Sequence, residues 1–332
     1  MTFYYISILA ALGGFFLAFY IHRKKTAHRP LVCPLKSNCD AVIHSRYSKF
    51  FGIPVELLGM FYYVLVAASY VIFLKFPELM PSVVVFGVLF MTSAAFVFSL
   101  YLTFIQAFVL KQWCTWCLMS AGLCTVIFVS VLSGSGFGPV SLLAEHKVIV
   151  MILHVFGVAL GLGGATISDL FFFKFLKNFR ISEEEADIMH TLSQVIWFAL
   201  AIIVLSGLGL YFPKAEILNQ SPKFLVKMLI VGVIIANGTL LNLLISPRLV
   251  KISFAEKHEH QSGKLHHIRR LAFSLGAVSF VSWYSAFILG MLRSVPISFW
   301  QLFGLYSLVL ALAITGSQIM ERVLVRRASK RS

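Results

Sequence analysis

Charged side chains are scarce in this chain. Of its 332 residues, only 12% are charged and 59% are hydrophobic, and Asp and Glu together number 13. The mean hydropathy is +0.89. A soluble domain of this size has no interior large enough to hide so much apolar surface, and long uncharged runs are typical of membrane spans. The polar stretches between these runs are short, which excludes a large soluble domain.

Several cofactor motifs are also missing. The sequence contains no haem-attachment C-x-x-C-H, no glycine-rich dinucleotide fingerprint and no phosphate-binding P-loop. It therefore gives no sign of covalently attached haem, of a nicotinamide cofactor or of nucleotide hydrolysis.

Nine hydrophobic runs are long enough to cross a bilayer as helices. They cover approximately residues 3–21, 57–74, 82–104, 113–132, 148–172, 189–211, 224–245, 271–292 and 298–320. The first has no basic residue before it and no small-residue cleavage site after it, so we expect a retained helix rather than a secretory signal. The sequence predicts an all-α integral membrane protein with about nine transmembrane helices.

The net charge of +15 is unevenly distributed along the chain. With nine spans, the segments on the side of the first loop hold 22 Lys and Arg residues, and those on the other side hold 5. Basic loops stay in the cytoplasm, so this asymmetry predicts that the first loop and the C-terminus are cytoplasmic. The charge thus indicates a multi-pass topology in the cell membrane, and not a nucleic-acid partner.

The chain divides at a Gly/Ser-rich break. We expect one domain of four helices at 1–132, a linker at 133–147 and a second domain of five helices at 148–332. All five cysteines lie in the first domain.

Four of the cysteines form two pairs. Cys33 and Cys39 enclose the loop C-P-L-K-S-N-C, and Cys114 and Cys117 form C-T-W-C where a hydrophobic run begins. A C-x-x-C pair at a helix N-terminus favours the thiolate and is typical of a redox centre. The alternatives are a structural disulfide beside a chance C-x-x-C, or a zinc site, which the split spacing disfavours. We interpret Cys124 as a small buried apolar residue.

Electrons that leave a dithiol within a membrane need an acceptor that is soluble in lipid. A quinone, either ubiquinone or menaquinone, is the simplest such acceptor, and we expect it near the apolar ends of the second to fourth helices. Two pairs of cysteines on one side of the membrane then predict a relay by thiol–disulfide exchange.

The first domain resembles the vitamin K epoxide reductase family. The resemblance rests on elements that match in order over about residues 1–132: Cys33, Cys39, V-I-H-S-R-Y-S-K-F-F-G-I-P with Ser45, Leu58-Gly59-x-x-Tyr62, and Cys114-x-x-Cys117.

The resemblance implies a four-helix bundle around a quinone. Electrons would pass from a thioredoxin-like partner to the loop pair, then to the C-x-x-C pair and then to the quinone. It further implies that Cys39 exchanges with Cys114, that Cys117 lies nearest the quinone, and that Ser45 belongs to the active site. Many bacterial members carry a fused thioredoxin domain. This chain has none, so we expect a separate partner. Most members face the extracytoplasmic side, whereas the charge asymmetry here places the cysteines in the cytoplasm.

The second domain offers fewer signals. His154, Asp169, His190 and Lys227 lie in or beside predicted spans, where ionisable residues often have functions. A haem bound through His154 is one interpretation, and a structural polar contact is the favoured one. We interpret the histidine-rich run 258–267 as a solvated loop rather than a metal site. We predict no metal site.

Taken together, the residues and the resemblance predict a membrane thiol–quinone oxidoreductase that supports protein disulfide formation. The alternative is a membrane transporter or scaffold in which the cysteines only sense thiol redox state.

Overall fold

The computed structural model describes residues 2–27, 31–33, 38–77, 81–134, 138–175, 182–246, 262–293 and 295–329. Within these ranges the chain is almost entirely helical, and its only paired strands are β1 (Lys49–Phe50) and β2 (Ile53–Pro54). Nine helices in the described part are long and apolar enough to cross a membrane. The predicted all-α membrane fold is confirmed.

The contacts divide the chain into two compact units. Unit 1 comprises Met1–Leu153 and Val204–Pro213, and unit 2 comprises His154–Ile203 and Lys214–Ser332. The start of the long helix Lys147–Phe175 and the end of the long helix Glu183–Tyr211 therefore belong to unit 1. The division into autonomous domains at 1–132 and 148–332 stays a prediction.

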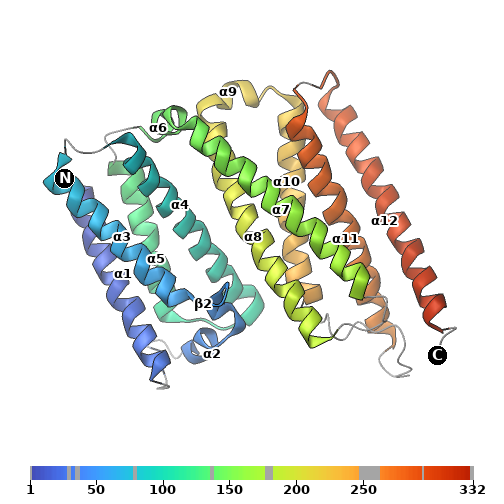
Figure 1. Cartoon of the computed structure of the whole chain (residues 1–332), viewed down its shortest axis with the longest axis horizontal. Helices are drawn as coiled ribbons and strands as arrows, with labels where there is room; N and C mark the ends of the chain where they lie inside the picture. Colours follow the sequence, from blue (N-terminus) through green and yellow to red (C-terminus); the bar gives the residue numbers. More distant parts are fainter. Residues whose placement is uncertain are drawn as a thin grey trace. The chain divides into compact units, whose positions relative to one another are not determined.

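Unit 1 is built around four membrane helices. They are α1 (Thr2–Thr26), α3 (Val55–Lys75), α4 (Ser82–Phe104, continued by a π-helical segment at Ile105–Leu110) and α5 (Thr115–Gly134). Helix α1 packs along both α3 and α5, and α4 packs against α5 (Figure 1). Buried hydrophobic side chains of these four helices form one core, and Leu142 of the short helix α6 (Pro139–Glu145) belongs to it.

A glycine allows α1 and α3 to approach closely. A Cβ atom at Gly14 of α1 would collide with the ring of Tyr63 on α3. The Tyr63 hydroxyl is 2.8 Å from Ser120 Oγ and donates to the Ser120 carbonyl at 3.0 Å, which links α3 to α5. One buried aromatic side chain thus joins three helices of the bundle.

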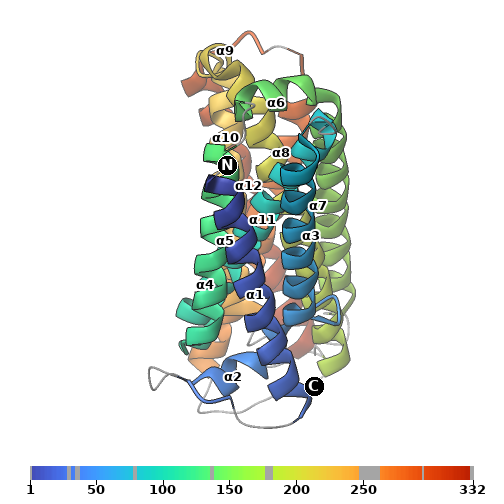
Figure 2. The same ribbon diagram turned by 90° about the vertical axis from the view of Figure 1, so that its left-hand side faces the viewer.

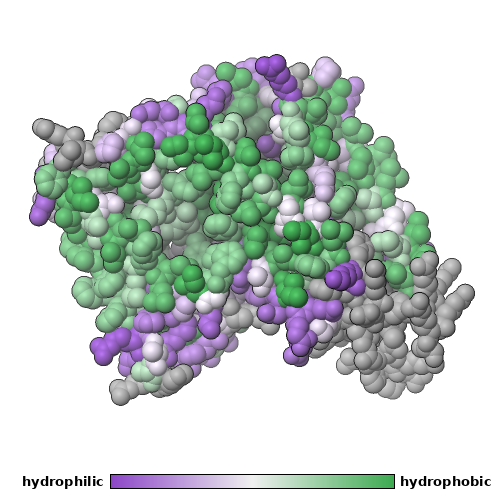
Figure 3. All heavy atoms as spheres, viewed as in Figure 1, coloured by the Kyte–Doolittle hydropathy of each residue, from purple (hydrophilic) through white to green (hydrophobic). Residues whose placement is uncertain are grey.

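One end of this bundle carries a small cap (Figure 2), which we define as the described residues 31–33 and 38–54. It contains helix α2 (Cys39–Ile43), a 3-10 turn at Arg46–Ser48, and the hairpin of β1 and β2. The hairpin turn holds Phe51 and Gly52 at φ of 48° and 79°, which is the left-handed backbone that a two-residue hairpin requires. Hydrophobic side chains cover the visible sides of the unit 1 helices and hydrophilic ones gather near the cap (Figure 3).

Unit 2 is also helical. Its elements include α7 (Lys147–Phe175), α8 (Glu183–Tyr211), α9 (Ala215–Leu218), α10 (Pro222–Leu240, continued by a π-helical segment at Leu241–Ile245), α11 (Ser262–Met291) and α12 (Phe299–Ser329). Helices α10, α11 and α12 pack on one another. Polar side chains join them. Arg269 Nε of α11 donates to Glu321 Oε1 of α12 at 2.6 Å, and Asn237 Nδ2 of α10 donates to the Leu275 carbonyl at 3.0 Å. A charge within a membrane span is costly unless it is paired, so these bonds explain how unit 2 holds polar residues.

The roles proposed for the ionisable residues of the second domain stay predictions. His154 and Lys227 lie close enough to interact electrostatically. Residues 258–261 of the histidine-rich run lie outside the described residues, and 262–267 form the first turns of α11. Among the residues that the structure describes, no group of three or more potential ligands gathers as a metal site would require.

Candidate functional site

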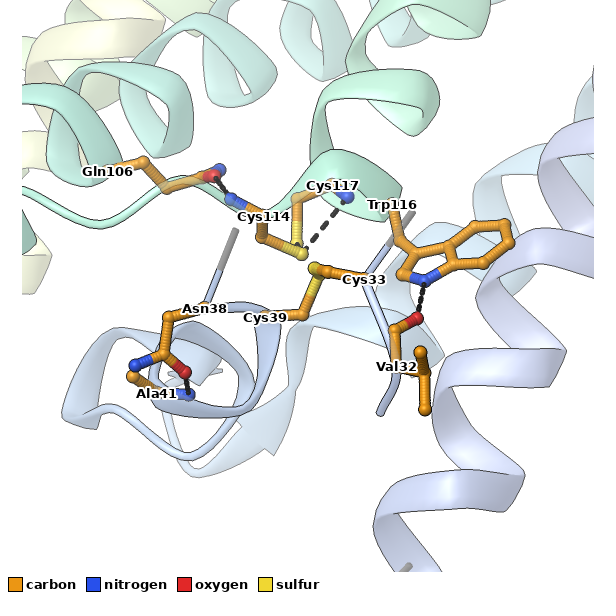
Figure 4. Close-up of a disulfide and its surroundings, with 9 residues drawn as sticks. All are labelled: Val32, Cys33, Asn38, Cys39, Ala41, Gln106, Cys114, Trp116 and Cys117. Atoms are coloured by element: carbon orange, nitrogen blue, oxygen red, sulfur yellow. Dashed lines mark hydrogen bonds between the residues drawn. A yellow bond between two sulfur atoms is a disulfide. The ribbon is translucent and has the colours of Figure 1, made fainter. Parts of the chain in front are cut away.

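The two cysteine pairs meet where the cap covers the bundle (Figure 4). Cys39 and Cys114 belong to one buried cluster, and Cys33 and Cys117 pack against it. Cys114 is 0% exposed and Cys39 is 1% exposed. The sequence spacing could not show this contact, because it depends on the cap folding back over the start of α5.

The two pairs differ in whether their sulfurs are bonded. Cys33 and Cys39 form a disulfide, whereas Cys114 and Cys117 are free thiols. The Cys117 thiol donates a hydrogen bond to Cys114 Sγ at a sulfur–sulfur distance of 2.7 Å. The structure therefore places a disulfide-bonded loop pair beside the C-x-x-C pair, whose two sulfurs lie next to each other.

Helix α5 activates Cys114. Because α5 begins at Thr115, Cys114 occupies the N-cap position, and its sulfur accepts the Cys117 N–H at 3.3 Å. The hydrogen bond from the Cys117 thiol, together with the backbone N–H groups of Trp116 and Cys117, holds the pKa of Cys114 below its ordinary value despite burial. The lowered pKa favours the thiolate form of Cys114.

Trp116 ties the redox helix to the cap. Its Nε1 donates to the Val32 carbonyl at 3.1 Å, next to Cys33, and its ring contacts Tyr20 of α1 with centroids 5.2 Å apart. Trp113, by contrast, is 47% exposed. The two tryptophans look equivalent in the sequence, and only the structure distinguishes their roles.

Ser45 lies in the cap, just beyond α2. Its hydroxyl donates to the Val42 carbonyl at 2.7 Å, and its N–H bonds the same carbonyl at 3.2 Å. These bonds close the end of α2, a common use of serine at such positions. The place of Ser45 in the chemistry stays a prediction.

Sequence reasoning missed Gln106. This residue lies in the π-helical segment after α4, is 3% exposed, and its side-chain Oε1 accepts the Cys114 N–H at 3.0 Å. An uncharged polar residue within an apolar run was the available signal, but its partner is eight positions away across a helix break.

Sequence reasoning also missed an ionic cluster beneath the cap. Lys25 Nζ of α1 lies 3.1 Å from Glu56 Oε1 of α3 and 3.4 Å from Ser48 Oγ, and His22 Nδ1 lies 3.7 Å from the same carboxylate. The Glu56 side chain is only 7% exposed. This pairing joins the ends of α1 and α3 at the level where the cap begins.

The surroundings of Cys117 are suited to a quinone. Its thiol is half-buried at the first turn of an apolar span, and the hydroxyls of Tyr63 and Ser120 lie about one turn deeper along α5. Cys124 is buried, as predicted, and its sulfur is 3.8 Å from the Tyr62 hydroxyl. An apolar site with a few polar groups is the usual environment of such a ligand.

The paired cysteines, the cap and the four-helix bundle can now be compared with known proteins. Residues 5–132 match the model of the Vitamin K epoxide reductase family. This part of the chain, which holds both cysteine pairs and the cap, is therefore similar to that family. The match associates residues 5–132 with a family of membrane thiol–disulfide oxidoreductases that use a quinone. The nine apolar helices of the described residues indicate a multi-pass membrane protein. No solved structure matches the chain.

Proposed function

We propose that this vitamin K epoxide reductase family protein oxidises a separate thioredoxin-like dithiol and passes the electrons to ubiquinone or menaquinone, thereby supporting protein disulfide formation. The observation that carries the proposal is the contact between an oxidised Cys33–Cys39 pair and a reduced Cys114–Cys117 pair in one buried cluster. Exchange requires that the two pairs meet.

The relay would proceed in balanced steps. The partner dithiol reduces the Cys33–Cys39 disulfide and leaves as a disulfide. The Cys39 thiolate then attacks Cys114 of an oxidised Cys114–Cys117 pair, and Cys117 leaves as a thiolate. Cys33 next attacks Cys39, which restores the loop disulfide and releases Cys114.

The last step would reform the Cys114–Cys117 disulfide. Two electrons and two protons leave the dithiol, and the quinone substrate is converted to the hydroquinone. Cys117 is assigned this role because it opens the membrane span, whereas Cys114 faces the cap.

Purified full-length protein in detergent tests the relay. With dithiothreitol and a soluble quinone, we expect quinone reduction that is lost in Cys117→Ala and in Cys114→Ala. Cys33→Ala should retain this activity but fail with a thioredoxin-like protein as donor. Full activity of Cys114→Ala would contradict the relay. The absence of turnover in the unmodified protein would favour a thiol-sensing transporter or scaffold.

We further propose that the cap faces the cytoplasm, because the basic residues divide 22 to 5 in favour of that side. A membrane-impermeant maleimide should leave reduced Cys39 unlabelled in intact cells and label it after lysis. Labelling in intact cells would place the cap outside without affecting the redox assignment.

A further inference from the structure

Gln106 is linked to the segment before the C-x-x-C pair by three hydrogen bonds. Its backbone carbonyl accepts the N–H groups of Lys111 and Gln112, and its side-chain Oε1 accepts the N–H of Cys114. The side chain is 3% exposed, so water does not compete for these bonds. One buried residue therefore bonds three positions of the connection between α4 and α5, and Figure 4 shows its side-chain bond to Cys114.

The backbone around Gln106 is specialised. Residues Ile105–Leu110 form a π-helix, and Lys111 then adopts the left-handed conformation with φ of 52°. A π-helical turn contains an extra residue, and such turns are frequent at functional sites. A non-glycine residue at positive φ is uncommon and persists only where its surroundings enforce it. Both features turn the chain so that Cys114 comes within reach of the Gln106 amide.

The hydrogen bond from the Cys114 N–H to Gln106 fixes the orientation of the Cys114 peptide. The Cys114 N–H points to Gln106, and the Cys114 sulfur is left to accept the Cys117 N–H at 3.3 Å. This is the arrangement of an N-cap residue, with a sulfur in place of the usual oxygen acceptor. Without the amide oxygen, the buried Cys114 N–H would have to seek another acceptor.

We propose that Gln106 is a positioning residue for the redox centre, because it fixes the Cys114 peptide so that the Cys114 sulfur caps α5 and faces the Cys33–Cys39 disulfide. The role in turnover rests on the proposed function, whereas the role in holding Cys114 does not. The groups that face this turn are Cys117 of α5, the disulfide of the cap and Glu56 of α3. The Glu56 carboxylate is near enough to Cys117 to interact with it electrostatically, and it is paired with Lys25 and His22. None of them bonds the Cys114 N–H.

The test is the pH profile of Cys114 alkylation by iodoacetamide in the full-length protein, followed by mass spectrometry. Gln106→Met keeps the side-chain length and removes the acceptor. We expect the midpoint to move to higher pH by about 0.5 to 1 unit, and alkylation at neutral pH to slow about three- to tenfold, because the thiolate loses ordered N–H donors. Quinone reduction by dithiothreitol should slow in parallel.

Thr92→Val is the matched control. Thr92 is a buried polar residue of the same helix, and its hydroxyl bonds only the Val88 and Leu89 carbonyls of α4. It should keep the wild-type alkylation profile. If Gln106→Met does not fold, Gln106→Asn serves instead, because it keeps a buried amide that is too short to reach Cys114.

Failure of the positioning role of Gln106 and failure of the proposed function give different results. A folded Gln106 variant with the wild-type alkylation profile would overturn the inference, whatever its turnover. Wild-type protein that reduces no quinone, but whose Gln106 variants show the alkaline shift, would overturn the proposed function and support the positioning role.

Discussion

Replacing Trp116 by Phe isolates one contact between the redox helix and the cap. Phe keeps an aromatic ring against Tyr20 and removes only the hydrogen bond from Nε1 to the Val32 carbonyl. A neutral hydrogen bond contributes about 1 kcal/mol, within a range of about 0.5–1.5 kcal/mol. This is the free energy by which we expect the closed cap to be destabilised.

This free energy determines how much faster Cys114 is alkylated in the Trp116→Phe variant. Cys114 is 0% exposed, so a reagent reaches it only when the cap opens. If opening is fast and unfavourable, the alkylation rate is proportional to the opening equilibrium constant. A loss of about 1 kcal/mol then raises the rate about fivefold, with bounds of about twofold and about twelvefold.

The assay starts from the state in the structure, with the loop pair oxidised and the C-x-x-C pair reduced. Alkylation of Cys114 is followed by mass spectrometry at several pH values, and the increase should be the same at each. Trp113→Phe is the control, because Trp113 is 47% exposed and should leave the rate unchanged. Equal rates in Trp116→Phe and wild-type protein, or an equal increase in Trp113→Phe, would refute the idea that this bond holds the cap.

Three further predictions concern stability. Glu56→Ala leaves the partly buried Lys25 without its carboxylate and should lower the free energy of unfolding by up to about 3 kcal/mol, measured by denaturant titration in detergent. The double variant Lys25→Met, Glu56→Leu should recover most of this loss, and a single variant as stable as wild type would contradict the pairing. Gly14→Ala should lower the free energy of unfolding by about 1–3 kcal/mol, because its Cβ would collide with the buried Tyr63 ring. Gly13→Ala, whose Cβ would lie 3.7 Å from its nearest neighbour, should be near neutral. Equal unfolding temperatures for the two variants would refute this packing. The pKa of Cys114 is lowered in the folded state, so the folded protein binds fewer protons than the unfolded chain. The unfolding temperature of reduced protein should therefore rise with pH up to the ordinary cysteine pKa of about 8.5. The same rise in a Cys114→Ser variant would show that the Cys114 thiol does not cause it.

Much of the architecture could be predicted from the sequence because the membrane imposes it. A span needs about 20 apolar residues and must satisfy its backbone internally, so nine long apolar runs predict nine helices. Their ends differ by a few residues. The first run was predicted to end at residue 21, but α1 continues to Thr26 through the basic residues that follow, because local hydrogen bonds rather than hydropathy set the end of a helix.

The sequence by itself determined the chemistry of the site: which cysteines are paired in the sequence, where each pair lies relative to a helix start, and to which family residues 5–132 are related. The tertiary structure alone decided which groups act on those cysteines. Gln106 reaches Cys114 across a π-helical turn, Trp116 rather than Trp113 donates a hydrogen bond to the cap, and Glu56 contacts Lys25 at a separation of 31 residues. Hydropathy depends on each residue's own side chain and is therefore visible in a sequence. These contacts depend on how helices rotate about their axes and on where the cap folds back, and both are set by packing between distant residues.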